Sequence, residues 1–193
     1  MDMDGLANPC RFTVLFQAKS PDRAASDQTG EAAAQQAIDS DIASLHFGCM
    51  IRVHGTCVSI NGNGVLMRGP SGSGKSDLAL RLIDGGGLLV ADDQVEIDRR
   101  DGCLWAAPPA TLAGLLEVRG VGILQLCHCA PARVVLLVDL VAADKVERLP
   151  APANEEVLGV ALPGIALDPW EVSAAAKVRL AVQTVTRTIM LLP

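Results

Sequence analysis

The chain has 193 residues, half of them hydrophobic and 20% charged, with a net charge of −6 at pH 7. This length suits one well-buried domain, and the high apolar content argues against a disordered chain. Three Phe, two Trp and no Tyr leave few rings for stacking bases, and the negative charge would repel a phosphate backbone, so we expect no nucleic-acid partner.

The composition also bears on membranes and compartment. No apolar run reaches the roughly 18 residues that cross a bilayer, and the first ten residues, MDMDGLANPC, are acidic where a signal peptide is basic. Six cysteines without a dense, regular framework are typical of free thiols in a reducing compartment. We therefore predict a cytoplasmic protein without a membrane partner.

Residues 1–45 are polar and rich in alanine, without a strong apolar period. We predict a flexible or poorly structured N-terminal extension over 1–45 and a P-loop catalytic domain over 46–193. The short apolar patch from Phe12 to Phe16 is compatible with an edge strand or with disorder, and the sequence leaves both open.

Two β-prone runs, CMIRVHGTCVSI and GVLMRG, are separated by the Asn-Gly repeat at 61–64. Asn-Gly pairs supply the positive φ angles of a tight hairpin turn, so we predict two antiparallel strands leading into the next loop. The segment SDLALRLID then has its leucines at helical spacing and stops at three glycines, 85–87. This pattern predicts a strand, a loop and a helix in succession.

Further strands are predicted along the rest of the chain. Residues 88–91 form a short apolar run that ends in Asp92-Asp93, and VEIDRRDGCLWA is typical of a hairpin. We expect the sheet to continue through 115–118 and 122–126, and the run ARVVLLVDLV to be a central strand.

The C-terminal part predicts a Pro-containing connection over 149–167 and then a long helix in DPWEVSAAAKVRLAVQTVTRTIMLL. Asp168 would cap this helix, Pro169 fits its first position, and Glu171 lies three residues after the cap. Many strands, few helices and several hairpins favour an α/β fold built on a mixed sheet rather than regular βαβ alternation.

The sequence GPSGSGKS matches the phosphate-binding pattern G-x-x-x-x-G-K-S in full. Its glycines let backbone N–H groups surround phosphate, Lys75 reaches the outer phosphates, and the Ser76 hydroxyl can bind Mg²⁺. The helix that follows directs its positive N-terminus at the same place. A chance match is the alternative, but the position between a strand and a helix favours an ATP site made of Gly69, Pro70, Ser71, Gly72, Ser73, Gly74, Lys75 and Ser76.

Asp92 and Asp93 end an apolar strand shortly after this loop. That is the position of the carboxylate that holds Mg²⁺ or its water in P-loop proteins, and a second carboxylate can act as a general base toward an incoming hydroxyl. A solvated turn is the alternative interpretation.

Other candidates are weaker by pattern alone. His54 lies on a strand, where a lone histidine is more often packed or exposed than catalytic. Glu117 and Arg119 share one face of a strand, either as a surface ion pair or as part of a phosphate and Mg²⁺ site. Lys145 and Arg148 occupy a charged loop, which by default is a solvated surface.

The order HGTCVSINGNGVLMRGPSGSGKSDLALRLIDGGGLLVADDQVEI, followed by LLEVRGVGIL, resembles the catalytic domain of HPr kinase/phosphorylase. The resemblance covers about residues 50–180 and is that of a short form without the separate N-terminal domain. It implies a fold related to phosphoenolpyruvate carboxykinase, a homo-oligomer for which the common family form is a hexamer, and Mg²⁺-dependent phosphorylation by ATP of a serine on the phosphocarrier protein HPr.

The resemblance also implies roles for individual residues. The loop 69–76 would hold ATP, with Lys75 as a catalytic residue, and Ser76 with Glu117 would bind Mg²⁺. Asp93, next to Asp92, would accept the serine proton and return one in phosphorolysis, while His54 would orient that centre. Arg148 would correspond to an active-site arginine. Arg119, Gly120 and Gly122, in the E-x-R-G-x-G strand motif, would support the site.

One departure from the family pattern affects the reverse reaction. Longer members carry a basic loop linked to dephosphorylation, whereas the comparable stretch here, LPGIALDPW, has no basic residue. Because phosphate attack on phosphoserine brings anions together, we predict kinase activity with weak phosphorolysis. The competing hypotheses are a catalytically silent ATP-sensing module and a P-loop kinase for a small molecule; His54, Asp92, Asp93 and Glu117 together favour catalysis.

Overall fold

The computed structural model describes residues 50–189, so the predicted extension over 1–45, including Phe12–Phe16, lies outside the described residues. The strands are β1 (Ile51–His54), β2 (Thr56–Ile60), β3 (Asn63–Arg68), β4 (Leu88–Ala91), β5 (Gln94–Arg100), β6 (Cys103–Ala107), β7 (Leu115–Val118), β8 (Gly122–Gln125), β9 (Ala132–Leu140), β10 (Ala153–Val157) and β11 (Val160–Leu167). The helices are α2 (Lys75–Asp84) and α3 (Ala174–Val185), with short 3-10 turns η1 (Ala110–Leu112) and η2 (Ala143–Lys145).

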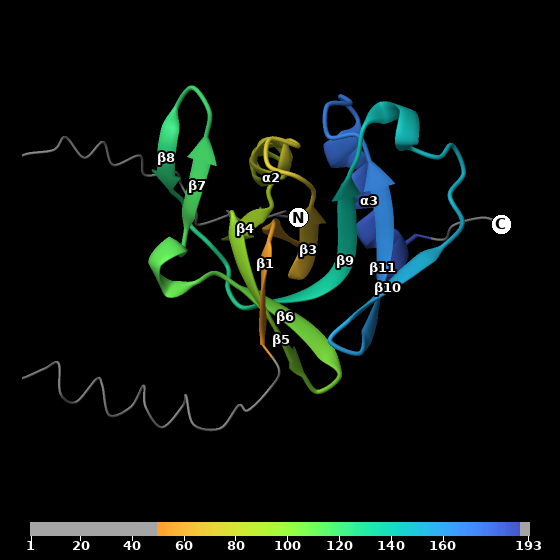
Figure 1. Ribbon diagram of the computed structural model, residues 1–193, viewed down its shortest axis with the longest axis horizontal. Helices are drawn as coiled ribbons and strands as arrows, with labels where there is room; N and C mark the ends of the chain where they lie inside the picture. Colours follow the sequence, from red (N-terminus) through yellow and green to blue (C-terminus); the bar gives the residue numbers. More distant parts are fainter. Residues whose placement is uncertain (1–49, 190–193) are drawn as a thin grey trace, which may run out of the picture.

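Nine strands form one mixed sheet in which β9 occupies a central position (Figure 1). Along one side β9 pairs in parallel with β3. Along its other side, its first half pairs antiparallel with β6 and its second half pairs in parallel with β11. The mixed sheet and the central strand expected from ARVVLLVDLV are therefore confirmed.

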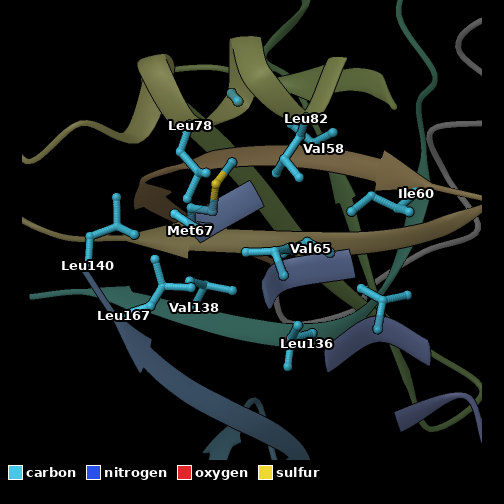
Figure 2. Packing of buried hydrophobic residues seen from close by; sticks show 14 residues of the cluster. Val58, Ile60, Val65, Met67, Leu78, Leu82, Leu136, Val138, Leu140 and Leu167 are labelled. Carbon is cyan, nitrogen blue, oxygen red and sulfur yellow. The ribbon is translucent and has the colours of Figure 1, made fainter. Parts of the chain in front are cut away.

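Two apolar clusters fill the two faces of this sheet. On one face the helices α2 and α3 cover β2, β3 and β9, and Figure 2 shows Leu78 and Leu82 of α2 lying over Val58 and Met67. On the other face, side chains of β2, β3, β4, β5, β6 and β9 form a second cluster, which includes Val95 and Leu137. Sequence alternation along each strand directs neighbouring side chains into opposite clusters.

Two predicted hairpin turns are present as expected. Asn61 and Gly62 connect β2 to β3 with φ angles of 51° and 80°, and Asp101 and Gly102 connect β5 to β6 with φ angles of 48° and 72°. Positive φ at both central residues is the geometry that matches strand twist in a two-residue turn. The hairpin that leads into the glycine-rich loop is thus confirmed.

Two details of the predicted strands were wrong. The run CMIRVHGTCVSI is divided at Gly55 into β1, which pairs with β5, and β2, which pairs with β3 and β4. A Cβ on Gly55 would lie 2.9 Å from the Met67 carbonyl oxygen, so the backbone approaches its neighbour too closely for other residues. The strands β7 and β8 form a separate two-stranded sheet that stands away from the main one in Figure 1.

The segment 149–167 is not a simple connection, because it contains the β10–β11 hairpin. Its turn is Leu158-Gly159, with φ angles of 50° and 73°. A leucine at positive φ is uncommon, so Gly159 is the only sequence signal for this turn. The β11 strand also contains most of LPGIALDPW, which is therefore largely strand rather than loop.

The C-terminal helix α3 begins at Ala174, not at Pro169. Asp168 does accept a hydrogen bond from the Trp170 backbone N–H at 3.0 Å, but the segment then stays non-helical. Arg81 of α2 donates to the Pro169 and Glu171 carbonyl oxygens, which a helix starting at Pro169 would use for its own bonds. A partner distant in sequence thus displaces the helix start.

An arginine at the end of β3 joins three strands. Arg68 donates hydrogen bonds to Asp139 of β9, at 2.8–3.0 Å, and to Glu155 of β10. The hydrogen bonds from Arg68 hold the pKa of Glu155 below its ordinary value, although burial opposes them. The network attaches the exposed β10 strand to the sheet.

We expect Glu155→Gln to lower the unfolding temperature at neutral pH by roughly 1–3 °C, a small effect because Glu155 is half exposed. A depressed carboxyl pKa stabilises the fold above the unfolded-state pKa, and this contribution is lost as the pH falls through the folded-state pKa. The difference between variant and wild type should therefore vanish in acid. Thermal unfolding followed by circular dichroism tests this, with Glu156→Gln as the matched control; equal shifts for the two variants would contradict it.

Candidate functional site

The candidate site is a cavity where the loop after β3, the N-terminus of α2, the end of β4 and the β7–β8 hairpin meet. Its lining residues are His54, Thr56, Ser71, Gly72, Gly74, Lys75, Ser76, Asp77, Asp92, Asp93, Glu117, Val118, Arg119 and Trp170. The structure therefore brings together most of the site residues predicted from the sequence.

The glycine-rich loop has the backbone conformation that its sequence requires at Gly74. This residue precedes α2 with φ of 90° and ψ of 14°, in the left-handed region that glycine adopts without strain. A Cβ on it would also lie 3.2 Å from the Pro169 ring. Because the first N–H groups of a helix have no intrahelical acceptor, the loop ends at a set of free donors directed into the cavity.

The Lys75 side chain lies over the start of the loop. Its ammonium donates to the Gly69 carbonyl oxygen at 2.8 Å and the Pro70 carbonyl oxygen at 3.0 Å. Lys75 is only 7% exposed, and burial lowers its pKa below the ordinary lysine value, while Asp92 and Asp93 oppose that shift. Because solvent screens this ammonium little, an anion bound beside it would interact with it strongly.

Asp92 is the buried acceptor at the centre of the site, with 7% of its surface exposed. Its carboxylate accepts hydrogen bonds from Thr56 Oγ1 at 2.7 Å and from Ser76 Oγ at 3.0 and 3.2 Å. The Glu117 backbone N–H lies 3.4 Å from the same carboxylate. Asp92 thus joins β2, α2 and β7 at one point.

Asp93 differs from its neighbour in both exposure and backbone conformation. Its side chain is 66% exposed, and its φ of 65° is the left-handed conformation that Asp and Asn tolerate better than most residues. His54 Nδ1 lies 2.9 Å from the Asp93 carbonyl oxygen and 3.3 Å from its Oδ1. Because a carbonyl can only accept, this geometry assigns the proton to Nδ1 of His54.

Two further predicted residues enter the cavity from the β7–β8 hairpin, whose first strand contacts α2. Glu117 and Arg119 line the cavity, while Gly120 and Gly122 stand in and after the exposed turn, outside the lining. Arg148 lies in an exposed loop and also outside the lining. Gly69, Pro70 and Ser73 belong to the loop but lie outside the cavity lining.

Sequence reasoning did not single out four lining residues, Thr56, Asp77, Val118 and Trp170. Thr56 lies two positions after His54, but the strand break at Gly55 hides their shared location. Asp77 follows the loop directly, so its proximity alone was an available signal. Trp170 comes from a segment about 95 residues after Lys75 in the chain, and no local sequence pattern indicates that it lies at the cavity.

Thr56 positions Asp92, so replacing it should weaken the site without unfolding the chain. We expect Thr56→Val, which keeps the shape and removes the hydroxyl, to lower the Mg²⁺ affinity of the magnesium site predicted from the sequence by roughly 10-fold, the low end for losses of such supporting hydrogen bonds. Thr56→Ser retains the hydroxyl and should behave like wild type. The apparent Mg²⁺ requirement of both variants tests this, and an unchanged requirement in Thr56→Val would contradict it.

In residues 50–189, neither helix combines the length and the apolar character that a bilayer crossing requires.

Comparisons with known proteins agree on one family. The family model described as HPr Serine kinase C-terminal domain matches residues 46–190. An HPr kinase/phosphorylase of Bordetella pertussis is 38% identical over 151 residues, covering 72% of this chain and 48% of the relative. An HPr kinase/phosphorylase of Streptococcus thermophilus is 53% identical over 74 residues, covering 38% of this chain and 24% of the relative.

A solved structure described as the HPr(Ser) kinase/phosphatase from Coxiella burnetii matches with a TM-score of 0.60 and 27% identity, over 72% of this chain and 95% of that one. The chain spans about half the length of the Bordetella relative and about a quarter of the Streptococcus relative. The match of the family model over 46–190 includes the loop, the Asp-Asp pair and the β7–β8 hairpin. The chain therefore belongs to the HPr Serine kinase C-terminal domain family.

Proposed function

We propose that this chain transfers the γ-phosphate of ATP, with Mg²⁺, to a serine of the phosphocarrier protein HPr. The observation that carries the proposal is the convergence in one cavity of the loop before α2 with Asp92, bound to Ser76, and Asp93, beside His54. Family membership supports HPr as the acceptor class. The matched range also supports our division of the chain into an extension over 1–45 and a P-loop domain over 46–193.

The loop would hold the phosphates of ATP through backbone N–H groups and Lys75. The sequence GPSGSGKS and the left-handed Gly74 before α2 support a P-loop. The family resemblance extends this proposal to a fold of the phosphoenolpyruvate carboxykinase type. The remaining loop members, from Gly69 to Ser73, would contribute backbone around the phosphates. Arg148, from its exposed loop, would have to approach when substrate binds.

The donor set suits Mg²⁺. No cluster of three His, Cys, Asp or Glu side chains within residues 50–189 forms a site for a metal by itself. Mg²⁺ prefers one or two carboxylates together with substrate phosphates, and Ser76, Asp92 and Glu117 offer this kind of oxygen set. When bound, the ion would neutralise charge on the phosphates.

The charges lining the cavity explain why a cation is needed. Asp77, Asp92, Asp93 and Glu117 contribute four carboxylates, whereas Lys75 and Arg119 contribute two cations. This balance of about −2 would repel a triphosphate on its own. We therefore expect nucleotide binding to depend strongly on Mg²⁺.

In this proposal Asp93 would act as the base. Its exposed carboxylate would take the proton from the serine hydroxyl as the serine oxygen attacks the γ-phosphorus and ADP leaves with the electrons of the broken P–O bond. His54, held at the Asp93 backbone and side chain, would fix the direction of that carboxylate. Arg119 would face the transferred phosphate from the β7–β8 hairpin, whose turn contains Gly120 and Gly122.

Phosphorolysis of phosphoserine-HPr should be weak. The stretch LPGIALDPW has no basic residue, and Arg81, which donates to the Pro169 carbonyl oxygen within it, is also bonded to Asp77 and to the Glu171 carbonyl oxygen. Little positive charge is thus left there to screen an attacking phosphate. We expect incubation of phosphoserine-HPr with the protein, Mg²⁺ and phosphate to release pyrophosphate much more slowly than the kinase consumes ATP. Comparable rates would contradict this prediction.

Mass spectrometry of HPr after incubation with the protein, ATP and Mg²⁺ tests the proposed function. Addition of one phosphate to a serine would support it. If HPr stays unmodified while ATP binds, a silent ATP-sensing module is favoured. If ATP is consumed only with a small-molecule acceptor, a small-molecule kinase is favoured.

We infer that the active form is a cytoplasmic homo-oligomer, and we expect a hexamer. Light scattering after size-exclusion chromatography would measure the number of subunits.

A further inference from the structure

An exposed indole ring lies at the candidate site. Trp170 is 65% exposed and lines the cavity beside the glycine-rich loop. Among residues 50–189, Trp105 and Trp170 are the only Phe, Tyr or Trp side chains, and Trp105 lies on β6 next to Arg100. An exposed large apolar side chain in a binding cavity is more informative than one scattered on a surface.

The ring is carried by a backbone segment that is fixed on both sides. The Trp170 backbone N–H donates to the Asp168 carboxylate, while Arg81 of α2 donates to the carbonyl oxygens of Pro169 and Glu171. Arg81 is itself held by Asp77 at 2.8 Å. The segment is thus tied to the helix that follows the phosphate loop, and a ligand contacting the ring would order little additional chain.

The Trp170 ring lies beside the loop that would hold the phosphates of a nucleotide. A Cβ on Gly74 would lie 3.3 Å from Trp170 Cζ2, so the edge of the indole ring is packed against the residue that directly precedes α2. Asp77, in the first turn of the same helix, also lines the cavity. Phosphates held along the loop therefore have an aromatic surface beside them, at the helix end.

We infer that Trp170 stacks on the purine base of the nucleoside triphosphate whose phosphates the loop binds. The inference rests on the proposed function and adds to it the residue that recognises the base. Every base has a π face, so a ring at this place favours a nucleotide over inorganic polyphosphate without hydrogen-bond readout. The fixed backbone segment would orient the Trp170 ring relative to the base, and the loop would orient the phosphates.

Two ligands separate base recognition from phosphate recognition. In the full chain carrying Trp105→Phe, which leaves Trp170 as the sole tryptophan, ATP with Mg²⁺ should change indole fluorescence strongly, and inorganic tripolyphosphate with Mg²⁺ should change it little. By calorimetry, Trp170→Ala should weaken ATP binding by roughly 10-fold or more and leave tripolyphosphate binding unchanged. Trp170→Phe, which keeps an aromatic face, should retain most of the ATP affinity.

The contrary outcomes are distinct. Equal weakening of both ligands in Trp170→Ala would show that the ring only supports Gly74, and unchanged ATP affinity would show that the base lies elsewhere; either result overturns the stacking inference alone. An unchanged ATP affinity with a raised KM for HPr would assign Trp170 to the protein substrate and overturn it as well. If the wild type binds neither ligand, the proposed function fails and the inference falls with it.

Discussion

Asp93→Asn is expected to lower the rate of phosphate transfer to HPr by a factor of roughly 10²–10⁴, the usual contribution of a positioned general base. Asparagine has nearly the shape of aspartate and tolerates the left-handed backbone of residue 93, whose φ is 65°. The loop and Asp92 should be unaffected. The rate should be measured at saturating ATP and Mg²⁺, so that loss of the base is separated from loss of nucleotide binding.

Two further variants control this experiment. Asp93→Ala removes the carboxylate and also strains the backbone by about 1 kcal/mol, so it should lose the same activity and, in addition, some stability. His54→Asn would remove the ring that faces Asp93 and should lower the rate less than Asp93→Asn, because the base itself remains. A wild-type rate in Asp93→Asn would show that another group accepts the proton.

Lys75→Met is expected to reduce kcat/KM by roughly 10²–10³ or more, because a preorganised cation directed at the phosphates is lost from a buried site. Methionine fills most of the lysine volume, so packing under the loop should remain. The kinase assay and calorimetry with ATP test the prediction together, and activity within a few fold of wild type would contradict it.

The ionisation of Lys75 gives an independent check on misfolding. Burial lowers its pKa, so the charged ammonium opposes folding below the folded-state pKa, and this cost disappears as the pH rises above the unfolded-state pKa. Lys75→Met should therefore unfold at a temperature close to that of wild type even though its activity is lost. Bound nucleotide should raise the Lys75 pKa and cause proton uptake at alkaline pH, which calorimetry in buffers of different ionisation enthalpy would detect.

The local parts of the site could be predicted from the sequence because their signals are local. The loop lies between a strand and a helix, and the residues directly beside the loop indicate both elements. Asp92 and Asp93 directly follow an apolar strand, as predicted. The turn at Asn61 carried a strong signal as well. Each of these features depends on a few adjacent residues.

The remaining features depend on partners distant in sequence. The β10–β11 hairpin turns at Leu158, a residue that favours no turn, and its strand joins β9 only through pairing across the sheet. Helix α3 starts late because Arg81 occupies carbonyl groups ahead of it. The cavity role of Thr56 required knowing that β2 lies next to β4, which periodicity alone does not reveal.

The central place of β9 also determines when this site can form during synthesis. The phosphate loop follows Arg68 directly, yet β3, which ends there, needs β9 beside it, and the Arg68–Asp139 contact joins residues 71 positions apart. Non-local pairings of this kind make folding slow, and domains fold as units while the ribosome supplies the chain. A nascent chain that has displayed the entire GPSGSGKS motif would therefore still lack its binding site until β9 has left the ribosomal tunnel.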